Sequence, residues 1–269
     1  LARAYYQIGK FSLALTYLEK RYESTSELTD SIGIAGVYDN IGMVYVHFRN
    51  YEKAIELRMK ANEIYAAHNK KNMVASGYNW IGTIYKEQGE YSKAIEYSLK
   101  SVKLYEETNE KINSSYPLLN ISSIYRFLKQ YDKAKEYALA ARDKFVIANY
   151  LEGEAWSLYR LSIIYSDEHK YSTSVKYAED AKIIFNKIGN LYGIVCASML
   201  EGSANLNQGN ISIALNYFEN ALPIAIKMGD ENVVAVLYEN IGSSYKDKGD
   251  FRKALEYLYK SDKILNKIN

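Results

Sequence analysis

The side chains best suited to catalysis or metal binding are few and far apart in this sequence. The three histidines and the single cysteine are His47, His68, His169 and Cys196. None of the histidines forms a metal-spaced pair with another histidine or with the cysteine. The Gly-x4-Gly-Lys-Ser/Thr phosphate loop is absent, so isolated glycines such as Gly9 and Gly89 indicate turns. We therefore expect no enzyme activity, no metal and no cofactor, and we expect Cys196 to be a buried or groove-lining side chain.

Composition narrows the possible partners. The chain has 269 residues, of which 48% are hydrophobic and 25% charged, as in an ordinary soluble protein. A net charge of +2 creates no basic field, so we expect no nucleic-acid binding through this chain. No apolar run reaches about 18 residues, and no secretory signal opens the sequence, so we expect no membrane insertion. A single cysteine fits a reducing compartment, and the expected location is the cytoplasm, with a periplasmic sensor domain left open.

A 40-residue repeat organises these residues and runs through the chain without slippage. A small residue marks it at Ala14, Ala54, Ala94, Ala134, Ser174, Ala214 and Ala254. Nine residues earlier an aromatic residue recurs at Tyr5, Tyr45, Tyr85, Tyr125, Tyr165 and Tyr245, with Asn205 in its place once. Counting Ala35 as position 1, later repeats start near 75, 115, 155, 195 and 235, and residues 1–34 form a partial repeat. A period of this length predicts a helical solenoid.

Each repeat contains two helical segments. In the first, Tyr78, Ile81, Gly82 and Tyr85 lie at i, i+3, i+4 and i+7, which is one stripe of an α-helix. Glycine or serine at position 8 allows the two helices of a repeat to approach closely. Glycine is frequent at position 15, where it suits a left-handed helix end, and an aromatic residue starts the second helix two residues later. Such a short link predicts an antiparallel helical hairpin.

Two prolines and two substitutions at repeat positions depart from the pattern, and each predicts a local change in structure. Pro117 is expected in the first turn of its helix, with Ser114 or Ser115 as the cap. Pro223 lies inside a second helix and is expected to bend it. Because Asn205 replaces the stripe tyrosine and Ser174 the alanine, the fourth and fifth repeats are expected to pack less regularly.

This pattern resembles the tetratricopeptide repeat family from one end of the chain to the other. The matching block is an apolar residue, Gly, two variable residues and Tyr, followed by a turn Gly, an aromatic residue and Ala. The 40-residue unit is similar to the long-helix variant of leucine-glycine-asparagine repeat adaptors, kinesin light chains, and bacterial peptide-sensing regulators and sensor kinases. The resemblance implies an all-α, right-handed superhelical solenoid of antiparallel helix pairs, with six full repeats and a partial one at the N-terminal end.

In such a solenoid the first helices line the concave groove, and positions 2, 5, 6, 9, 12 and 13 are expected to face it. Position 6 holds Asn40, Asn120 and Asn240. An Asn amide can pair with both the N–H and the C=O of an extended peptide, and the resemblance implies this use. The alternative is that each amide is satisfied by its own helix or by water.

Aromatic and basic residues surround these asparagines in the middle of the chain. The further residues expected to contact a partner are Asn79, Trp80, Thr83, Lys86, Tyr116, Ser123, Arg126, Phe127, Trp156, Tyr159 and Arg160. Trp, Tyr and Arg dominate binding hot spots, so we expect the groove from the repeat at 75 through the repeat at 155 to be the binding surface. The alternative is that Trp80 and Trp156 only pack between neighbouring first helices.

The resemblance therefore implies a protein- or peptide-binding domain that holds an extended segment. A second interpretation is a sensory or regulatory domain of a bacterial signalling protein, which acts through ligand-linked conformational change or self-association. A third is a structural spacer without a ligand. Because the last residues leave Ile264, Leu265 and Ile268 on an uncapped edge, we expect residues 1–269 to be one solenoid domain within a longer protein, or to form a homodimer through terminal repeats.

Overall fold

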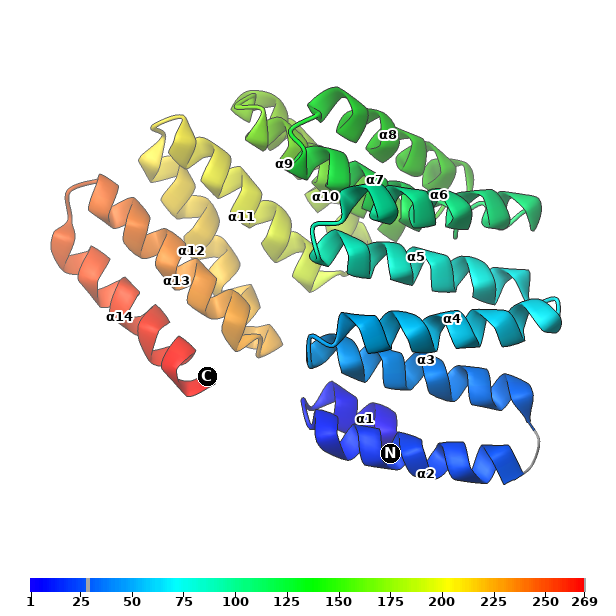
Figure 1. Ribbon diagram of the computed structural model, residues 1–269. Coiled ribbons are helices and arrows are strands. Elements are labelled where there is room, and N and C mark those ends of the chain that lie inside the picture. The colour runs from blue at the N-terminus through cyan, green and yellow to red at the C-terminus, as the bar shows by residue number, and fades with distance from the viewer. Residues whose placement is uncertain (28–29, 269) are drawn as a thin grey trace. The chain divides into compact units, whose positions relative to one another are not determined.

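Helices make up nearly the whole chain. The computed structural model describes residues 1–27 and 30–268, and over those residues the regular structure is fourteen α-helices without a strand (Figure 1). The first helices of the repeats are α1 (Ala2–Gln7), α3 (Ser31–His47), α5 (Lys71–Glu87), α7 (Ser115–Phe127), α9 (Leu151–Asp167), α11 (Leu191–Asn207) and α13 (Glu231–Asp247). The second helices are α2 (Phe11–Glu27), α4 (Tyr51–Ala67), α6 (Tyr91–Glu107), α8 (Tyr131–Ile147), α10 (Tyr171–Ile188), α12 (Ile211–Met228) and α14 (Phe251–Ile268).

These helices form two units. Unit 1 is Leu1–Leu128 with α1 to α7, and unit 2 is Lys129–Asn269 with α8 to α14. Within each unit, consecutive helices lie side by side and antiparallel (Figure 1). This confirms the predicted all-α arrangement of helix pairs with a 40-residue period. Most first helices begin four residues before the predicted repeat boundary, as α3 does at Ser31.

Left-handed residues end the helices at regular intervals. Within each repeat they are Gly9, Arg49, Gly89, Lys129, His169, Gly209 and Gly249, with φ between 55° and 84°. Between repeats they are Asn69, Asn109, Asn149, Gly189 and Gly229, with φ between 52° and 72°. The first set confirms the predicted turn at position 15. The second set shows the same device 20 residues later, where asparagine and glycine tolerate this conformation best.

The two helices of a repeat meet at positions 8 and 20. A Cβ added to Gly82 would lie 3.0 Å from the Ala94 carbonyl oxygen and 2.8 Å from the Ser98 hydroxyl. In the fourth repeat, Ser162 and Ser174 replace this Gly–Ala pair and are fully buried. Each hydroxyl donates to the other residue's carbonyl, at 2.8 Å from Ser162 and 2.9 Å from Ser174. The two substitutions compensate each other, so this contact is closed by hydrogen bonds where we expected looser packing.

The third repeat departs from the pattern at its start. Helix α7 begins at Ser115, which is four residues later in its repeat than the starts of α3, α5, α9, α11 and α13. Pro117 lies in the first turn of α7, as predicted. Ser114 occupies the N-cap position, but its hydroxyl donates to the Lys111 carbonyl at 2.8 Å and does not cap the helix. The short helix therefore follows from a proline that cannot continue a helix on its N-terminal side.

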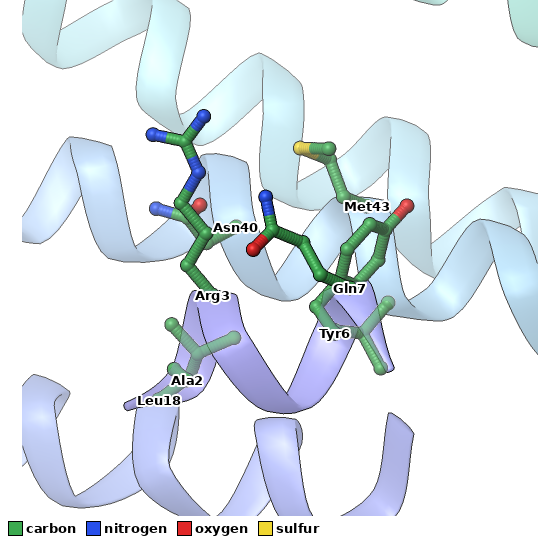
Figure 2. Close-up of a pocket in the computed structure, with 8 residues that line it drawn as sticks. Ala2, Arg3, Tyr6, Gln7, Leu18, Asn40 and Met43 are labelled. Carbon is green, nitrogen blue, oxygen red and sulfur yellow. The ribbon is translucent and has the colours of Figure 1, made fainter. Parts of the chain in front are cut away.

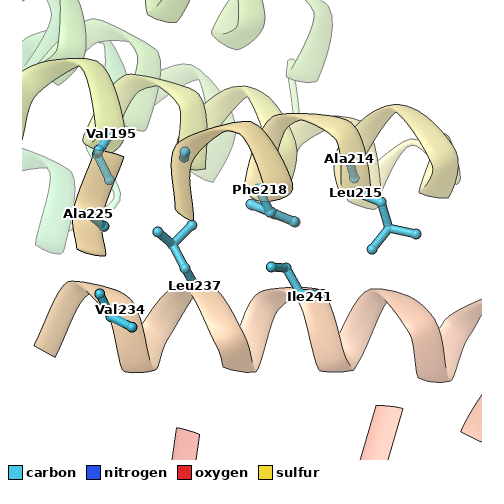
Figure 3. Packing of buried hydrophobic residues seen from close by; sticks show 9 residues of the cluster. Val195, Ala214, Leu215, Phe218, Ala225, Val234, Leu237 and Ile241 are labelled. Carbon is cyan, nitrogen blue, oxygen red and sulfur yellow. The ribbon is translucent and has the colours of Figure 1, made fainter. Parts of the chain in front are cut away.

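The largest core cluster of unit 2 lies between α11, α12 and α13. Phe218 of α12 points toward Leu237 and Ile241 of α13, and Ala214 and Ala225 of α12 belong to the same cluster (Figure 3). All three of these large side chains are completely buried. The aromatic ring of Phe218 also occupies the space where a Cβ on Gly202 would lie, 2.4 Å away. Hydrophobic burial of this kind holds each first helix against both neighbouring second helices.

A buried charge interrupts the core of the fifth repeat. Glu201 stands at position 7 and is completely buried, and its carboxylate forms an ion pair with Lys182 of α10. The Lys182 ammonium also lies 5.0 Å above the Tyr217 ring. Burial raises the pKa of Glu201, and Lys182 opposes that shift. One turn later, at the position that holds tyrosine in the other repeats, Asn205 is buried and donates to the Glu201 carbonyl at 2.8 Å.

Candidate binding surfaces

Three predicted site residues of unit 1 form a polar cluster across neighbouring first helices. The Asn120 side-chain nitrogen donates to Asn79 Oδ1 at 2.7 Å and to Thr83 Oγ1 at 3.0 Å. Thr83 in turn donates to the Asn79 carbonyl at 3.1 Å. All three side chains are half-buried. Both amide hydrogens of Asn120 are thus used within the chain, and its carbonyl oxygen and the Asn79 amide nitrogen are the groups left for a ligand.

Trp80 has a packing role. Its ring lies 4.4 Å from the Arg58 guanidinium, and a Cβ added to Gly42 would meet the ring at 3.5 Å. Arg58 is buried and pairs with Asp39 at 2.6 Å, and the Tyr65 hydroxyl donates to the same carboxylate at 3.0 Å. Burial raises the pKa of Asp39, against the effect of Arg58. Trp80 thus packs on the neighbouring first helix α3, as the alternative stated, and also on the second helix α4.

The other predicted residues of unit 1 differ in accessibility. Asn40 donates to the Gly36 carbonyl of its own helix at 2.5 Å. This contact corresponds to the alternative in which the amide of a position 6 asparagine is satisfied by its own helix. Ser123 is only 3% exposed and donates to the Leu119 carbonyl, so a partner cannot reach it and its assignment to the site was wrong. The polar residue there serves its own helix. Lys86 is half-buried near the end of α5.

Exposed aromatic surface lies at both ends of α7. Tyr116 and Phe127 are each exposed. The Phe127 ring stacks on Tyr91 with centroids 6.4 Å apart, and the Arg126 guanidinium lies 4.8 Å from the same ring. This arrangement leaves one face of an aromatic–arginine stack available at the surface of unit 1.

A hollow of about 350 Å³ lies between α1 and α3, and sequence reasoning did not identify it. Its lining is Ala2, Arg3, Tyr6, Gln7, Leu18, Asn40, Met43 and Val44. Figure 2 shows Arg3, Gln7 and Met43 directed into the same space as Asn40. The Tyr6 hydroxyl and His47 Nε2 are 2.5 Å apart, and this hydrogen bond ties α1 to the end of α3.

In unit 2, Trp156 is the centre of an aromatic cluster. Its ring meets Tyr159 edge-on at 5.4 Å and Phe185 at 4.8 Å, and it lies 6.1 Å from Tyr192. Phe185 is fully buried, so Trp156 is anchored to the core of α9 and α10. The predicted residues Arg160 and Asn240 are half-buried on α9 and α13.

A second hollow, of about 340 Å³, opens beside this cluster and is lined only by first helices. Its lining is Tyr159, Tyr192, Cys196, Met199, Leu200, Ser203, Asn232, Val233 and Val236. Six of these residues hold positions 2, 5, 6 or 9, so the predicted groove-facing positions of α9, α11 and α13 do converge. We call this hollow the unit 2 pocket. Sequence reasoning named Tyr159 and missed most of the rest, since its search favoured polar and basic side chains.

The thiol of Cys196 forms part of the pocket wall. It is half-buried and interacts with the hydroxyls of Tyr192 and Tyr159. Burial raises the pKa of the thiol, which therefore stays protonated at neutral pH. The single cysteine of the chain is thus a neutral, weakly polar wall residue, in agreement with the expectation that it is buried or lines the groove.

Within residues 1–27 and 30–268, no cluster of three or more His, Cys, Asp or Glu side chains is arranged to hold a metal ion. Among the described helices, none is long and apolar enough to cross a membrane.

Comparison with known proteins identifies the fold. The sequence matches the tetratricopeptide repeat family over residues 33–107, 73–145 and 235–264. A search of curated proteins found no match. Among solved structures, the apo form of RapI aligns over 99% of this chain and 96% of its own length, with 18% identity and a TM-score of 0.72.

Two further solved structures are similar over the same span. A Rap protein complexed with Competence and Sporulation Factor aligns over 99% of this chain and 73% of its own, with 15% identity and a TM-score of 0.69. A signal transduction ATPase with a tetratricopeptide repeat sensor, from Pyrococcus horikoshii, aligns over 99% of this chain and 40% of its own, with 20% identity and a TM-score of 0.73. At these identities the likeness concerns the fold. Together with the sequence matches and the helix pairs described above, it establishes that this chain belongs to the tetratricopeptide repeat family.

Proposed function

We propose that this chain is a binding domain that holds an extended peptide or protein segment against its first helices. The observation that carries the proposal is the convergence of groove-facing positions from successive first helices. In unit 1 they form the polar cluster of Asn79, Thr83 and Asn120, and in unit 2 they form the unit 2 pocket. Polar groups that can pair with a backbone, and a hollow that accepts a side chain, are both features that an extended ligand requires.

The structural likeness supports a peptide ligand. One similar solved structure is a Rap protein complexed with Competence and Sporulation Factor. The groups available at the unit 1 cluster fit an extended backbone, because the Asn120 carbonyl oxygen accepts a hydrogen bond and the Asn79 nitrogen donates one. The proposal assigns binding and no catalysis to these residues.

A test begins with selecting peptides that bind the chain from a random 12-residue display library. Asn79→Ala combined with Asn120→Ala is expected to weaken the selected peptides about tenfold, or about 1.4 kcal/mol. Asn72→Ala is the matched control, because Asn72 also lies on α5 and its side-chain nitrogen donates a hydrogen bond to Glu110 of the next repeat at 2.9 Å, but it stands outside the cluster. Failure to select any peptide, or equal binding by both variants, would contradict the proposal.

Regulation through the same binding is the second candidate function. A similar solved structure is a signal transduction ATPase whose tetratricopeptide repeats are named as its sensor. In this chain a ligand that bridges several first helices would favour one spacing of those helices over others, which is how binding energy shifts a conformational equilibrium. Small-angle X-ray scattering with and without a selected peptide tests this use, and identical scattering curves would argue against it.

A further inference from the structure

We propose that the ligand places one bulky, uncharged apolar side chain in the unit 2 pocket, and that this contact sets the sequence preference of the chain. This inference rests on the proposed function and adds to it the chemistry of one ligand residue. It assigns the two surfaces different roles, since the cluster in unit 1 offers hydrogen bonds and the pocket in unit 2 offers an apolar wall.

The fifth repeat differs from its siblings on the face that lines this pocket. Position 6 is Leu200 there, and the same position holds Asn40, Trp80, Asn120, Arg160 and Asn240 in the other repeats. Position 5 is Met199, where two other repeats carry Asp39 and Glu239. Met199 also packs against the core of unit 2, but Leu200 is half-buried and is not among the side chains packed against that core, so helix packing does not account for Leu200. An apolar residue that the fold does not need, and that lines a hollow, indicates a site for an apolar group.

The lining of the pocket is uncharged and disfavours an anionic occupant. None of its nine side chains is Asp, Glu, Lys or Arg. A carboxylate placed there would lose water without gaining a cation from the lining, and Asp230, whose charge acts on Tyr192 and Cys196, would repel it. The polar atoms at the wall are the hydroxyls of Tyr159, Tyr192 and Ser203 and the amide of Asn232, which can hydrogen-bond the backbone on either side of a buried side chain.

Apolar surface is open to solvent at the mouth of the pocket. Tyr192 is 45% exposed and Val236 is 41% exposed. Covering such surface is favourable in proportion to the apolar area removed from water. The volume of about 340 Å³ lies at the lower end of the range for ligand sites, which suits one large side chain with its adjacent backbone.

The test compares peptide selection on the wild-type chain and on Leu200→Asn. This substitution installs the residue that three other repeats carry at the same position, so it is compatible with the fold. We expect wild-type selections to enrich Leu, Met, Ile or Phe at one fixed peptide position, and Leu200→Asn selections to lose that enrichment. Replacing the enriched residue by Asp is expected to weaken wild-type binding at least tenfold. Ile183→Asn is the control, because Ile183 is exposed on α10 outside the pocket.

Cys196 supplies a readout located in the pocket itself. Since it is the only cysteine of the chain, its alkylation by N-ethylmaleimide reports one site. Saturating selected peptide is expected to slow alkylation at least fivefold, and the Asp-substituted peptide at the same concentration is expected to protect less. Val236→Asp is a second variant that should abolish the preference, in case Leu200→Asn fails to fold.

The outcomes separate this inference from the proposed function. Peptides that bind without a fixed apolar position, or that leave Cys196 alkylation unchanged, overturn the inference and leave peptide binding intact. Selection of a fixed acidic or basic residue that protects Cys196 overturns it as well. Failure to select any peptide overturns both proposals together.

Discussion

At the scale of single residues, the buried ion pair in the fifth repeat is the least expected feature of the chain. Position 7 is an apolar core residue in the other full repeats, namely Ile41, Ile81, Ile121, Leu161 and Ile241. Glu201 takes this place, and Lys182 of the preceding repeat reaches it. Removing one partner of a buried ion pair leaves an uncompensated charge, whereas replacing both by apolar residues is often neutral or stabilising.

Lys182→Met is therefore expected to lower the unfolding free energy by about 3 kcal/mol at pH 7, because it leaves the Glu201 carboxylate buried without its cation. Combining it with Glu201→Ile is expected to restore or exceed wild-type stability. Urea denaturation followed by circular dichroism measures both variants. A double variant as unstable as Lys182→Met alone would contradict this account.

The same pair predicts a direction for the pH dependence. Burial raises the pKa of Glu201 above its ordinary value of 4.5, so just above that pH the folded chain holds a proton that the unfolded chain has lost. The contribution of Glu201 to stability therefore falls as the pH rises from about 4.5 through the higher folded pKa. The advantage of the double variant over wild type should grow over that interval. An advantage independent of pH would show that Glu201 is not the group responsible.

At the scale of helices, close approach at position 8 decides how tightly each repeat closes. Gly82→Ala is expected to lower the unfolding free energy by about 2 kcal/mol, because its Cβ would press on a backbone carbonyl oxygen at 3.0 Å. Gly36→Ala is the matched control, since a Cβ at this helical glycine meets only the Tyr65 hydroxyl at 4.0 Å. Helix propensity should make that variant neutral or more stable by up to about 1 kcal/mol. Thermal unfolding of the two variants compares them directly, and equal effects would be inconsistent with steric closure.

The sequence predicted helices better than it predicted surfaces, for a physical reason. Helix positions follow from a strict period of small and aromatic residues, so the turn at position 15 and the site of Pro117 were correct. Side-chain partners depend on neighbouring repeats, which a period does not describe. The contact of Trp80 with Arg58 was therefore not predicted, and the apolar pocket around Leu200 was overlooked.

At the scale of the whole molecule, one side of α14 carries a row of exposed apolar side chains. Phe251, Leu255 and Tyr259 follow one another at intervals of four and are 70%, 72% and 67% exposed. Inner repeats cover the equivalent aromatic residue with the next first helix, as Phe127 covers Tyr91. Of the three residues expected on this edge, Leu265 and Ile268 are exposed, whereas Ile264 packs against the core of unit 2.

This face makes the predicted self-association testable. If copies of the chain associate through α14, Leu255→Glu is expected to raise the dissociation constant of the dimer, measured by sedimentation, at least tenfold. The reason is that the substitution places a charge in an apolar contact. Ile147→Glu is the control, since Ile147 is exposed on α8. Wild-type chain that sediments as a monomer up to about 100 μM, where a weak interface would have formed, would refute association through this face.

The evenly spaced left-handed residues have a consequence for how such a chain changes over time. Over the described residues the same joint recurs at the same distance from the packing residues in every full repeat except the one that contains α7, so the two ends of a 40-residue segment from those repeats match. Unequal recombination that deletes or duplicates one such segment joins the end of one helix to the start of another through the same connection that already links neighbouring repeats. Genes of this kind can therefore lengthen or shorten a binding surface by whole repeats. Point substitutions at positions such as that of Leu200 change the ligand group that a single repeat contacts.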